Sequence, residues 1–171
     1  MRKGLLLVVL SLAVTAWATA APVVDGKVSA GEYTNTKAVL SGNGTLNWAQ
    51  DAQGGLNVAL SVKTKGWAAV GFGAQRMAGA SIYLGFVGTG GKAVFSEQMG
   101  KGHRHTDSSA ATADQSQVSR AGTATIVEFH IAADKLPFTG TSVPFIVAFG
   151  DTADLTTFHN DNIDSGTLTL K

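Results

Sequence analysis

The chain has 171 residues, enough for one domain with a substantial hydrophobic core, and its 13 basic and 12 acidic residues nearly balance. It has no run of basic residues, so nucleic acids and anionic lipids are not expected partners. It also lacks cysteine, which excludes disulfides, iron–sulfur clusters and thiol catalysis.

The N-terminus has the pattern of a secretory signal peptide. Arg2 and Lys3 form a basic start, an apolar run covers residues 5–14, and small residues follow at 18–20. The apolar run is too short to span a membrane comfortably, although a retained N-terminal anchor stays open. We therefore expect a signal peptide at residues 1–20, export to the periplasm or the extracellular space, and no stable membrane span after cleavage.

The remainder, residues 22–171, is expected to form a single domain of β-strands. Apolar and polar residues alternate in short segments separated by Gly-rich or polar turns, and helical periodicity is absent. This pattern predicts an all-β fold, an antiparallel β-sandwich of the immunoglobulin-like type. The expected strands cover residues 56–62, 70–72, 82–86, 92–97, 123–131, 143–149 and 168–170.

Two regions break the alternation and are expected to be loops. Residues 73–79 lie between glycines and have Met77 near their centre. Residues 100–114 are polar and include His103 and His105. Because binding residues often lie on loops that a rigid scaffold positions, we expect the second region to form the rim of a site.

Met77 and His159 are the strongest candidates for chemistry in this sequence. Each lies on a predicted loop next to a strand, and 82 positions separate them, so only tertiary structure can bring them together. A thioether and an imidazole on opposite sides of one pocket can ligate a haem iron, and Met/His ligation is typical of haem that carries electrons. No Cys-x-x-Cys-His motif is present, so such a haem would be held without covalent links.

Three segments resemble the DOMON family. They are DGKVSAGEY at residues 25–33, GWAAVGFGAQRM at 66–77 with ASIYLGF at 80–86, and the predicted strand at 143–150 that precedes His159. The resemblance covers residues 25–171, and its most specific part is the Gly-Trp-x-x-Val-Gly-Phe-Gly segment that precedes Met77.

The resemblance implies an immunoglobulin-like sandwich that binds haem b or, in some members, sugars. In the haem-binding branch, which includes the cytochrome domain of cellobiose dehydrogenase, a methionine on this loop and a histidine near the C-terminus are the axial ligands. Carried over by position, these residues are Met77 and His159.

A haem also needs apolar walls and donors for its propionates. Burying several hundred Å² of porphyrin contributes on the order of 10 kcal/mol before ordering costs, at about 25 cal/mol per Å². The candidate wall residues are Trp67, Phe72, Ile82, Leu84, Phe86, Phe149 and Phe158. Because side chains alternate along a strand, only some of them can face one pocket. Expected donors are Arg76, Tyr83, Arg104 and Lys101.

Other histidines leave alternatives open. His103 and His105, with Asp107 nearby, have a spacing that can bind zinc or copper, and either histidine could replace His159 as an axial ligand. His130 is expected to be a solvent-facing strand residue on the same face as Glu128.

The sequence contains no nucleophile elbow, no His-Glu-x-x-His and no phosphate loop, so we do not expect an enzyme. The favoured function is that of an exported b-type cytochrome domain that exchanges single electrons with a redox partner, such as a membrane cytochrome. The alternatives are a carbohydrate-binding module that uses Trp and Tyr as sugar platforms, and an interaction domain without a ligand.

Overall fold

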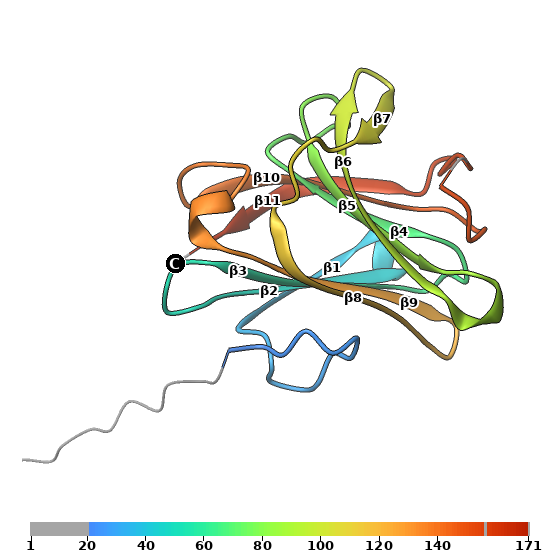
Figure 1. Ribbon diagram of the computed structural model, residues 1–171, viewed down its shortest axis with the longest axis horizontal. Coiled ribbons are helices and arrows are strands. Elements are labelled where there is room, and N and C mark those ends of the chain that lie inside the picture. The colour runs from blue at the N-terminus through green and yellow to red at the C-terminus, as the bar shows by residue number, and fades with distance from the viewer. Residues whose placement is uncertain (1–20, 156, 171) are drawn as a thin grey trace, which may run out of the picture.

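Two antiparallel β-sheets face each other in the computed structural model, which describes residues 21–155 and 157–170 (Figure 1). The five-stranded sheet has the order β1-β2-β3-β9-β8, and the six-stranded sheet has the order β11-β10-β4-β5-β6-β7. The predicted all-β sandwich is therefore confirmed. The predicted signal peptide at residues 1–20 lies outside the described residues. Among those that are described, no helix is both long and apolar enough to cross a membrane.

The strands are joined by turns and loops of different lengths. Their bounds are β1 Asn35–Val39, β2 Gly44–Gln50, β3 Leu56–Val62, β4 Ala68–Phe72, β5 Ser81–Val87, β6 Ala93–Lys101, β7 Arg104–Asp107, β8 Ala113–Ala121, β9 Ala124–Ile131, β10 Ser142–Phe149 and β11 Ile163–Thr169. Single 3₁₀ turns lie at Leu40–Gly42, Thr89–Gly91 and Ala133–Lys135. In the six-stranded sheet β4 pairs with β10 on one side and β5 on the other, which places its residues at the centre of that sheet.

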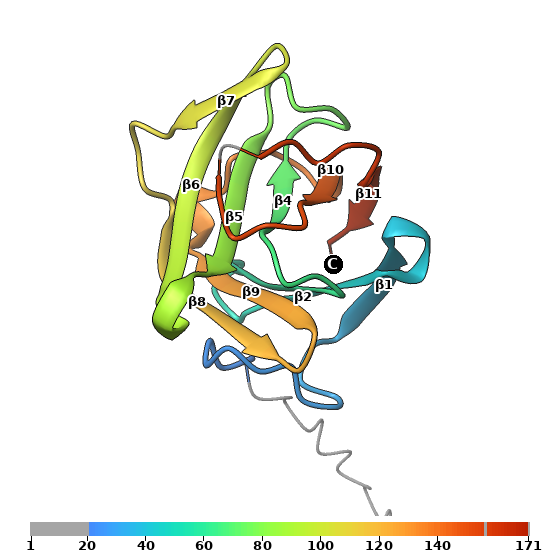
Figure 2. The ribbon, with the colours of Figure 1, turned by 90° about the vertical axis from the view of Figure 1, so that its right-hand side faces the viewer.

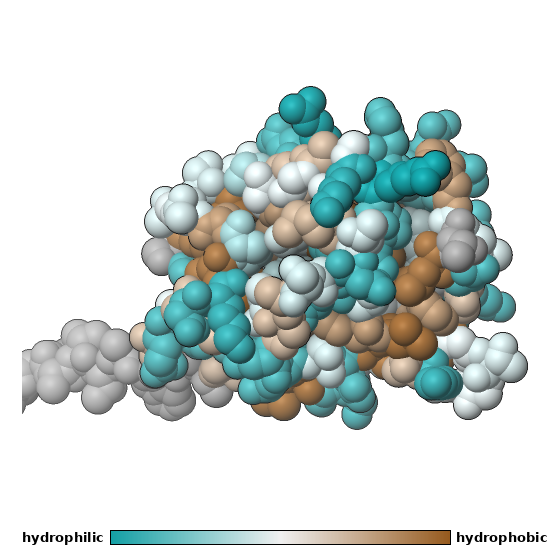
Figure 3. All heavy atoms as spheres, turned by 45° about the horizontal axis from the view of Figure 1, so that its top comes forward, coloured by the Kyte–Doolittle hydropathy of each residue, from teal (hydrophilic) through white to brown (hydrophobic). Residues whose placement is uncertain are grey.

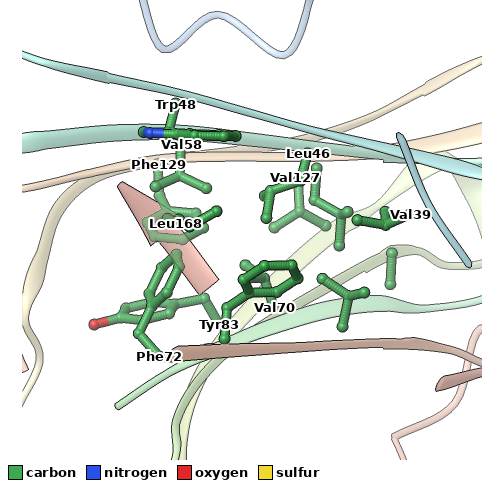
Figure 4. Close-up of a cluster of buried hydrophobic side chains, with 14 of the residues drawn as sticks. Val39, Leu46, Trp48, Val58, Val70, Phe72, Tyr83, Val127, Phe129 and Leu168 are labelled. Atoms are coloured by element: carbon green, nitrogen blue, oxygen red, sulfur yellow. The ribbon is translucent and has the colours of Figure 1, made fainter. Parts of the chain in front are cut away.

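The main hydrophobic core lies between the two sheets (Figure 4). Val70 and Phe72 of β4 and Tyr83 of β5 project into it from the six-stranded sheet, and Phe129 of β9 projects from the other. The rings of Tyr83 and Phe129 are stacked with their centroids 4.4 Å apart. Because side chains alternate along a strand, the neighbours of Val70, Phe72 and Tyr83 point to the opposite, outer face of the six-stranded sheet.

The polar region at residues 100–114 is not the loop that the sequence predicted. β6 continues to Lys101, and β7 pairs with its end to form a hairpin that projects from the sandwich (Figure 1). β7 is an edge strand with mostly exposed residues. Apolar alternation is absent there because an edge strand far from the core has no face to bury.

The expectation of a solvent-facing His130 is also wrong. Its Nε2 lies 2.9 Å from Asp51 Oδ2 and its Nδ1 lies 2.6 Å from Asp114 Oδ1, which leaves only 14% of the side chain exposed. Its neighbour on the same face, Glu128, is fully buried. Residues 21–34, here called the N-terminal strap, cover that part of the five-stranded sheet (Figure 1).

Candidate functional site

A second apolar layer lies on the outer face of the six-stranded sheet. Its buried members, here called the outer cluster, are Trp67, Ala69, Ala80, Ile82 and Leu84. Partly buried residues packed against the outer cluster include Met77, Ile146, Ala148 and Leu155. An outer sheet face is normally polar because it contacts water, so an apolar outer face indicates that something else covers it.

A cavity of about 510 Å³ lies over this outer cluster. Ala69, Gly71, Ile82, Leu84, Ile146 and Ala148 line its floor, and the β6–β7 hairpin and the loop between β10 and β11 form its sides. The described parts of that loop, residues 150–155 and 157–162, pass in front of β4 in Figure 2. Figure 3 brings the side of the molecule that carries the β6–β7 hairpin toward the viewer. On this surface hydrophilic residues lie next to hydrophobic ones. The volume falls within the range of small-molecule sites, about 300–1,000 Å³.

Met77 enters the cavity from the loop between β4 and β5. The loop is fixed at its base, because Gly79 N donates to Gly100 O at 3.0 Å and Gly100 N donates to Ala80 O at 2.9 Å. Gly100 of β6 leaves no space for a side chain at this contact: a Cβ built there would lie 1.7 Å from the carbonyl oxygen of Met77. The half-buried Met77 side chain packs against the outer cluster.

His159 enters the same cavity from the loop at residues 150–162. Its Nδ1 lies 2.6 Å from the carbonyl oxygen of Asn160, and its ring stacks on that of Phe158 at 4.4 Å. A carbonyl only accepts hydrogen bonds, so Nδ1 carries the proton and the Nε2 lone pair stays free. Metal-ligating histidines typically have this arrangement, in which the second nitrogen donates to a carbonyl or carboxylate.

Trp67 anchors the loop that carries His159. The indole Nε1 donates to Thr157 Oγ1 at 3.1 Å, and the Trp67 backbone N donates to Thr152 O at 3.2 Å. The indole lies directly over Gly150, where a Cβ would be 2.2 Å from Nε1. Trp67 therefore forms part of the cavity wall and also holds the His159 loop against β4.

A second imidazole, that of His105, lines the cavity from β7. Its Nδ1 contacts Gln98 Oε1, and Gln98 is 6% exposed. Burial lowers the pKa of His105 below its ordinary value, and the nearby His159 lowers that pKa further by electrostatic repulsion. Both imidazoles line the same cavity.

A family model described as the DOMON domain matches residues 40–150. The chain belongs to the DOMON family. The resemblance found in the sequence is thereby confirmed, and the match includes the loop of Met77.

Two solved structures share the fold of this DOMON domain. The cytochrome b domain of pyranose dehydrogenase from Coprinopsis cinerea is 13% identical with a TM-score of 0.59, over 78% of this chain and 80% of that one. The cytochrome domain of Myriococcum thermophilum cellobiose dehydrogenase is 13% identical with a TM-score of 0.51, over 75% of each chain. Comparison with curated proteins gives no significant match.

The DOMON fold brings some of the predicted site residues together at the cavity and places others elsewhere. Met77, His159, Trp67 and Phe158 all line the cavity. Phe72 and Tyr83 point into the core between the sheets, and the Tyr83 hydroxyl bonds to Thr112 Oγ1 at 2.6 Å. Both were predicted at the site. They lie on the inner face because side chains alternate along a strand, and the alternate positions, Ala69, Gly71, Ile82 and Leu84, face outward.

The predicted donors fall into two groups. Arg76 is exposed beside Met77 and does not line the cavity, whereas Arg104 does. The predicted zinc or copper site at His103, His105 and Asp107 is not formed, since no group of three or more His, Asp or Glu side chains in the described part of the chain is placed to hold a metal ion.

Sequence reasoning missed the small residues that shape the cavity. Ala69 and Gly71 on β4 and Ala148 on β10 make its floor low, and Gly100 and Gly150 allow Met77 and Trp67 to approach the sheet closely. Small residues at alternate positions of a central strand could have indicated the cavity from the sequence, because they leave space above the sheet for another group.

Proposed function

We propose that this DOMON domain binds haem b non-covalently in the cavity and exchanges single electrons with a redox partner. The observation that carries the proposal is that Met77 and His159, 82 positions apart, line one cavity above an apolar sheet face. Both solved structures described above are cytochrome domains in their own proteins, which supports the proposal.

The residues present fit a haem. The floor offers aliphatic groups and small residues to a flat macrocycle, and Arg104 at the rim offers a cation to a propionate. Met77 supplies a thioether, and His159 supplies an imidazole whose Nε2 is free. Haem b bound there would supply a one-electron iron couple, whose potential a thioether ligand raises relative to a second imidazole.

The roles of the protein side chains follow from this arrangement. Met77 and His159 would both hold the iron, which favours electron transfer over the binding of a substrate at the metal. Trp67 would hold the His159 loop in place and, with Phe158, would shield one edge of the site. The chain has no cysteine, so burial and the two axial ligands must retain the cofactor.

The Trp and Tyr residues do not favour the alternative of a carbohydrate-binding module. Sugar platforms need flat aromatic faces open to solvent. Among the described residues, Trp48, Trp67 and Tyr83 are only 8%, 5% and 1% exposed. Tyr33 is half-buried, and its hydroxyl is bound to Glu128. We therefore propose haem, not a sugar, as the ligand, and we propose export as the sequence indicates.

The test is to supply haem to the purified chain and record its visible spectra. We expect a low-spin spectrum with sharp α and β bands on reduction. His159→Ala should give high-spin iron and weaker haem retention, and Met77→Ala should remove the spectroscopic signature of sulfur ligation and lower the potential. Met99→Ala on the other face of β6 and Asp161→Ala on the His159 loop are the matched controls.

Two results would contradict the proposal. The first is a chain that takes up no haem and instead binds to polysaccharide columns. The second is haem uptake whose spectrum is the same in the wild type, Met77→Ala and His159→Ala, since the ligands would then be other residues.

A further inference from the structure

The register of the β6–β7 hairpin places His105 beside Met77. Gly100 of β6 pairs directly with His105 of β7, and residues opposite each other on antiparallel strands point to the same face. The missing side chain of Gly100 points at Met77, because a Cβ there would meet the Met77 backbone at 1.7 Å and its Cγ at 3.3 Å. His105 and Met77 therefore approach the cavity from the same side.

Gln98 fixes the tautomer of His105. The Gln98 Nε2 donates to Asp107 Oδ1 at 3.5 Å and to Ser96 Oγ at 3.1 Å. Since a carboxylate only accepts, the amide must present its oxygen to His105, and Nδ1 of His105 must be the donor. The Nε2 lone pair of His105 is left without a partner in this network, as in a metal-ligating histidine.

This support is more extensive than that of His159. Gln98 is buried and is itself held by two side chains of the hairpin, so His105 has a fixed anchor. The thioether of Met77 and the imidazoles of His103, His105 and His159 all line the cavity. Of the three imidazoles, only those of His105 and His159 have Nδ1 held by a hydrogen bond.

We propose that His105 is an alternative axial ligand that can replace Met77 opposite His159. The inference rests on the proposed function. In the exchange, His105 Nε2 would take the place of Met77 Sδ as the group that holds the iron, so one bond to iron would be lost and one gained. Both ligands are neutral, so neither a proton nor an electron is gained or lost. Replacing a thioether with an imidazole stabilises ferric iron, so the exchange lowers the reduction potential and gives the domain two redox settings.

The experiment uses the full chain loaded with haem and compares four proteins: wild type, Met77→Ala, Met77→Ala/His105→Ala and Met77→Ala/Thr106→Ala. Thr106 is the exposed neighbour of His105 on β7 and serves as the matched control. We expect Met77→Ala to stay low-spin, with the electron paramagnetic resonance signature of two imidazoles and a lower potential. The variant that also lacks His105 should become high-spin, whereas the Thr106 control should not.

Titration with free imidazole provides a second readout that does not depend on folding yield. In Met77→Ala, tethered His105 competes for the iron, so added imidazole should bind roughly tenfold or more weakly than in Met77→Ala/His105→Ala. Equal imidazole affinity in these two proteins, or a Met77→Ala protein that is already high-spin, would overturn the role of His105 while leaving Met/His ligation intact. A wild type that takes up no haem would overturn both proposals.

Discussion

The carbonyl oxygen of Met77 occupies the space in which a side chain at Gly100 would begin, 1.7 Å from the position of a Cβ. The loop between β4 and β5 can thus lie flat on the end of β6 only because residue 100 is glycine. This contact sets the height of Met77 above the outer cluster and so positions one side of the proposed haem site.

Gly100→Ala should therefore displace the Met77 loop. Overpacking of this kind costs about 1–3 kcal/mol, because the methyl group meets backbone that cannot move away by rotating a side chain. We expect a lower free energy of unfolding in urea and a lower fraction of sulfur-ligated haem. Gly88→Ala is the control, since its Cβ would meet nothing nearer than 3.5 Å. Equal behaviour of the two variants would show that the Met77 contact is not restrictive.

Trp67→Phe should loosen the loop that carries His159. The change removes the hydrogen bond from Nε1 to Thr157 Oγ1 and leaves a space in the cavity wall, at a cost of about 1–3 kcal/mol. Trp48→Phe is a matched control, because it removes a similar bond from Nε1 to Thr169 O at 3.2 Å in the main core. Both should lower the unfolding temperature, but only Trp67→Phe should speed the loss of haem to a haem-scavenging protein.

The stability of the domain should depend on pH through His130. Burial lowers the pKa of His130, but the hydrogen bonds and charges of Asp114 and Asp51 outweigh it, and the net pKa is raised. For Asp51, burial raises the pKa, but its hydrogen bond with His130 and those with Gly55 and Gln53 lower it overall. The imidazolium between two carboxylates is thus a favourable arrangement in the folded state.

The direction of each pKa shift determines how His130 and Asp51 contribute to the free energy of unfolding at different pH values. The contribution of His130 is complete below its unfolded pKa of about 6.5 and is lost as the pH rises through the higher folded pKa. That of Asp51 is complete above its unfolded pKa of about 3.9 and is lost as the pH falls through the lower folded pKa. In urea unfolding, the combined contribution of His130 and Asp51 to the free energy of unfolding should be greatest between about pH 4 and 6.5. His130→Gln should remove the decline in the free energy of unfolding above this range. An unchanged pH profile in that variant would refute the assignment.

Tyr33→Phe should weaken the N-terminal strap. The buried carboxylate of Glu128 accepts hydrogen bonds from Tyr33 Oη at 2.6 Å, Asp25 N at 2.9 Å and Gly26 N at 2.7 Å. Burial raises the pKa of Glu128, and these three donors oppose that rise. Loss of one donor to a charged group costs about 1.5–3 kcal/mol, so limited proteolysis within residues 21–34 should accelerate. Tyr83→Phe, which loses a hydroxyl bonded to Thr112, should leave the strap protected.

The sequence by itself was enough to predict the all-β sandwich and two of the residues in the candidate site. Period-two alternation reports that a strand has one buried face, and this signal is local. Met77 was identifiable because it interrupts that pattern just after a family motif, and His159 because it follows the last long strand; both line the cavity.

Which face of each strand meets the cavity was decided only by the tertiary structure. Alternation separates Phe72 and Tyr83 from Ala69, Gly71 and Ile82, but both sets are apolar, so the pattern cannot say which one faces the core and which the cavity. The hairpin that brings His105 next to Met77 depends on strand pairing, and the contact between Met77 and Gly100 depends on backbone atoms distant in sequence. These relationships arise when separate strands and loops close on one another, and no local pattern of residues encodes them.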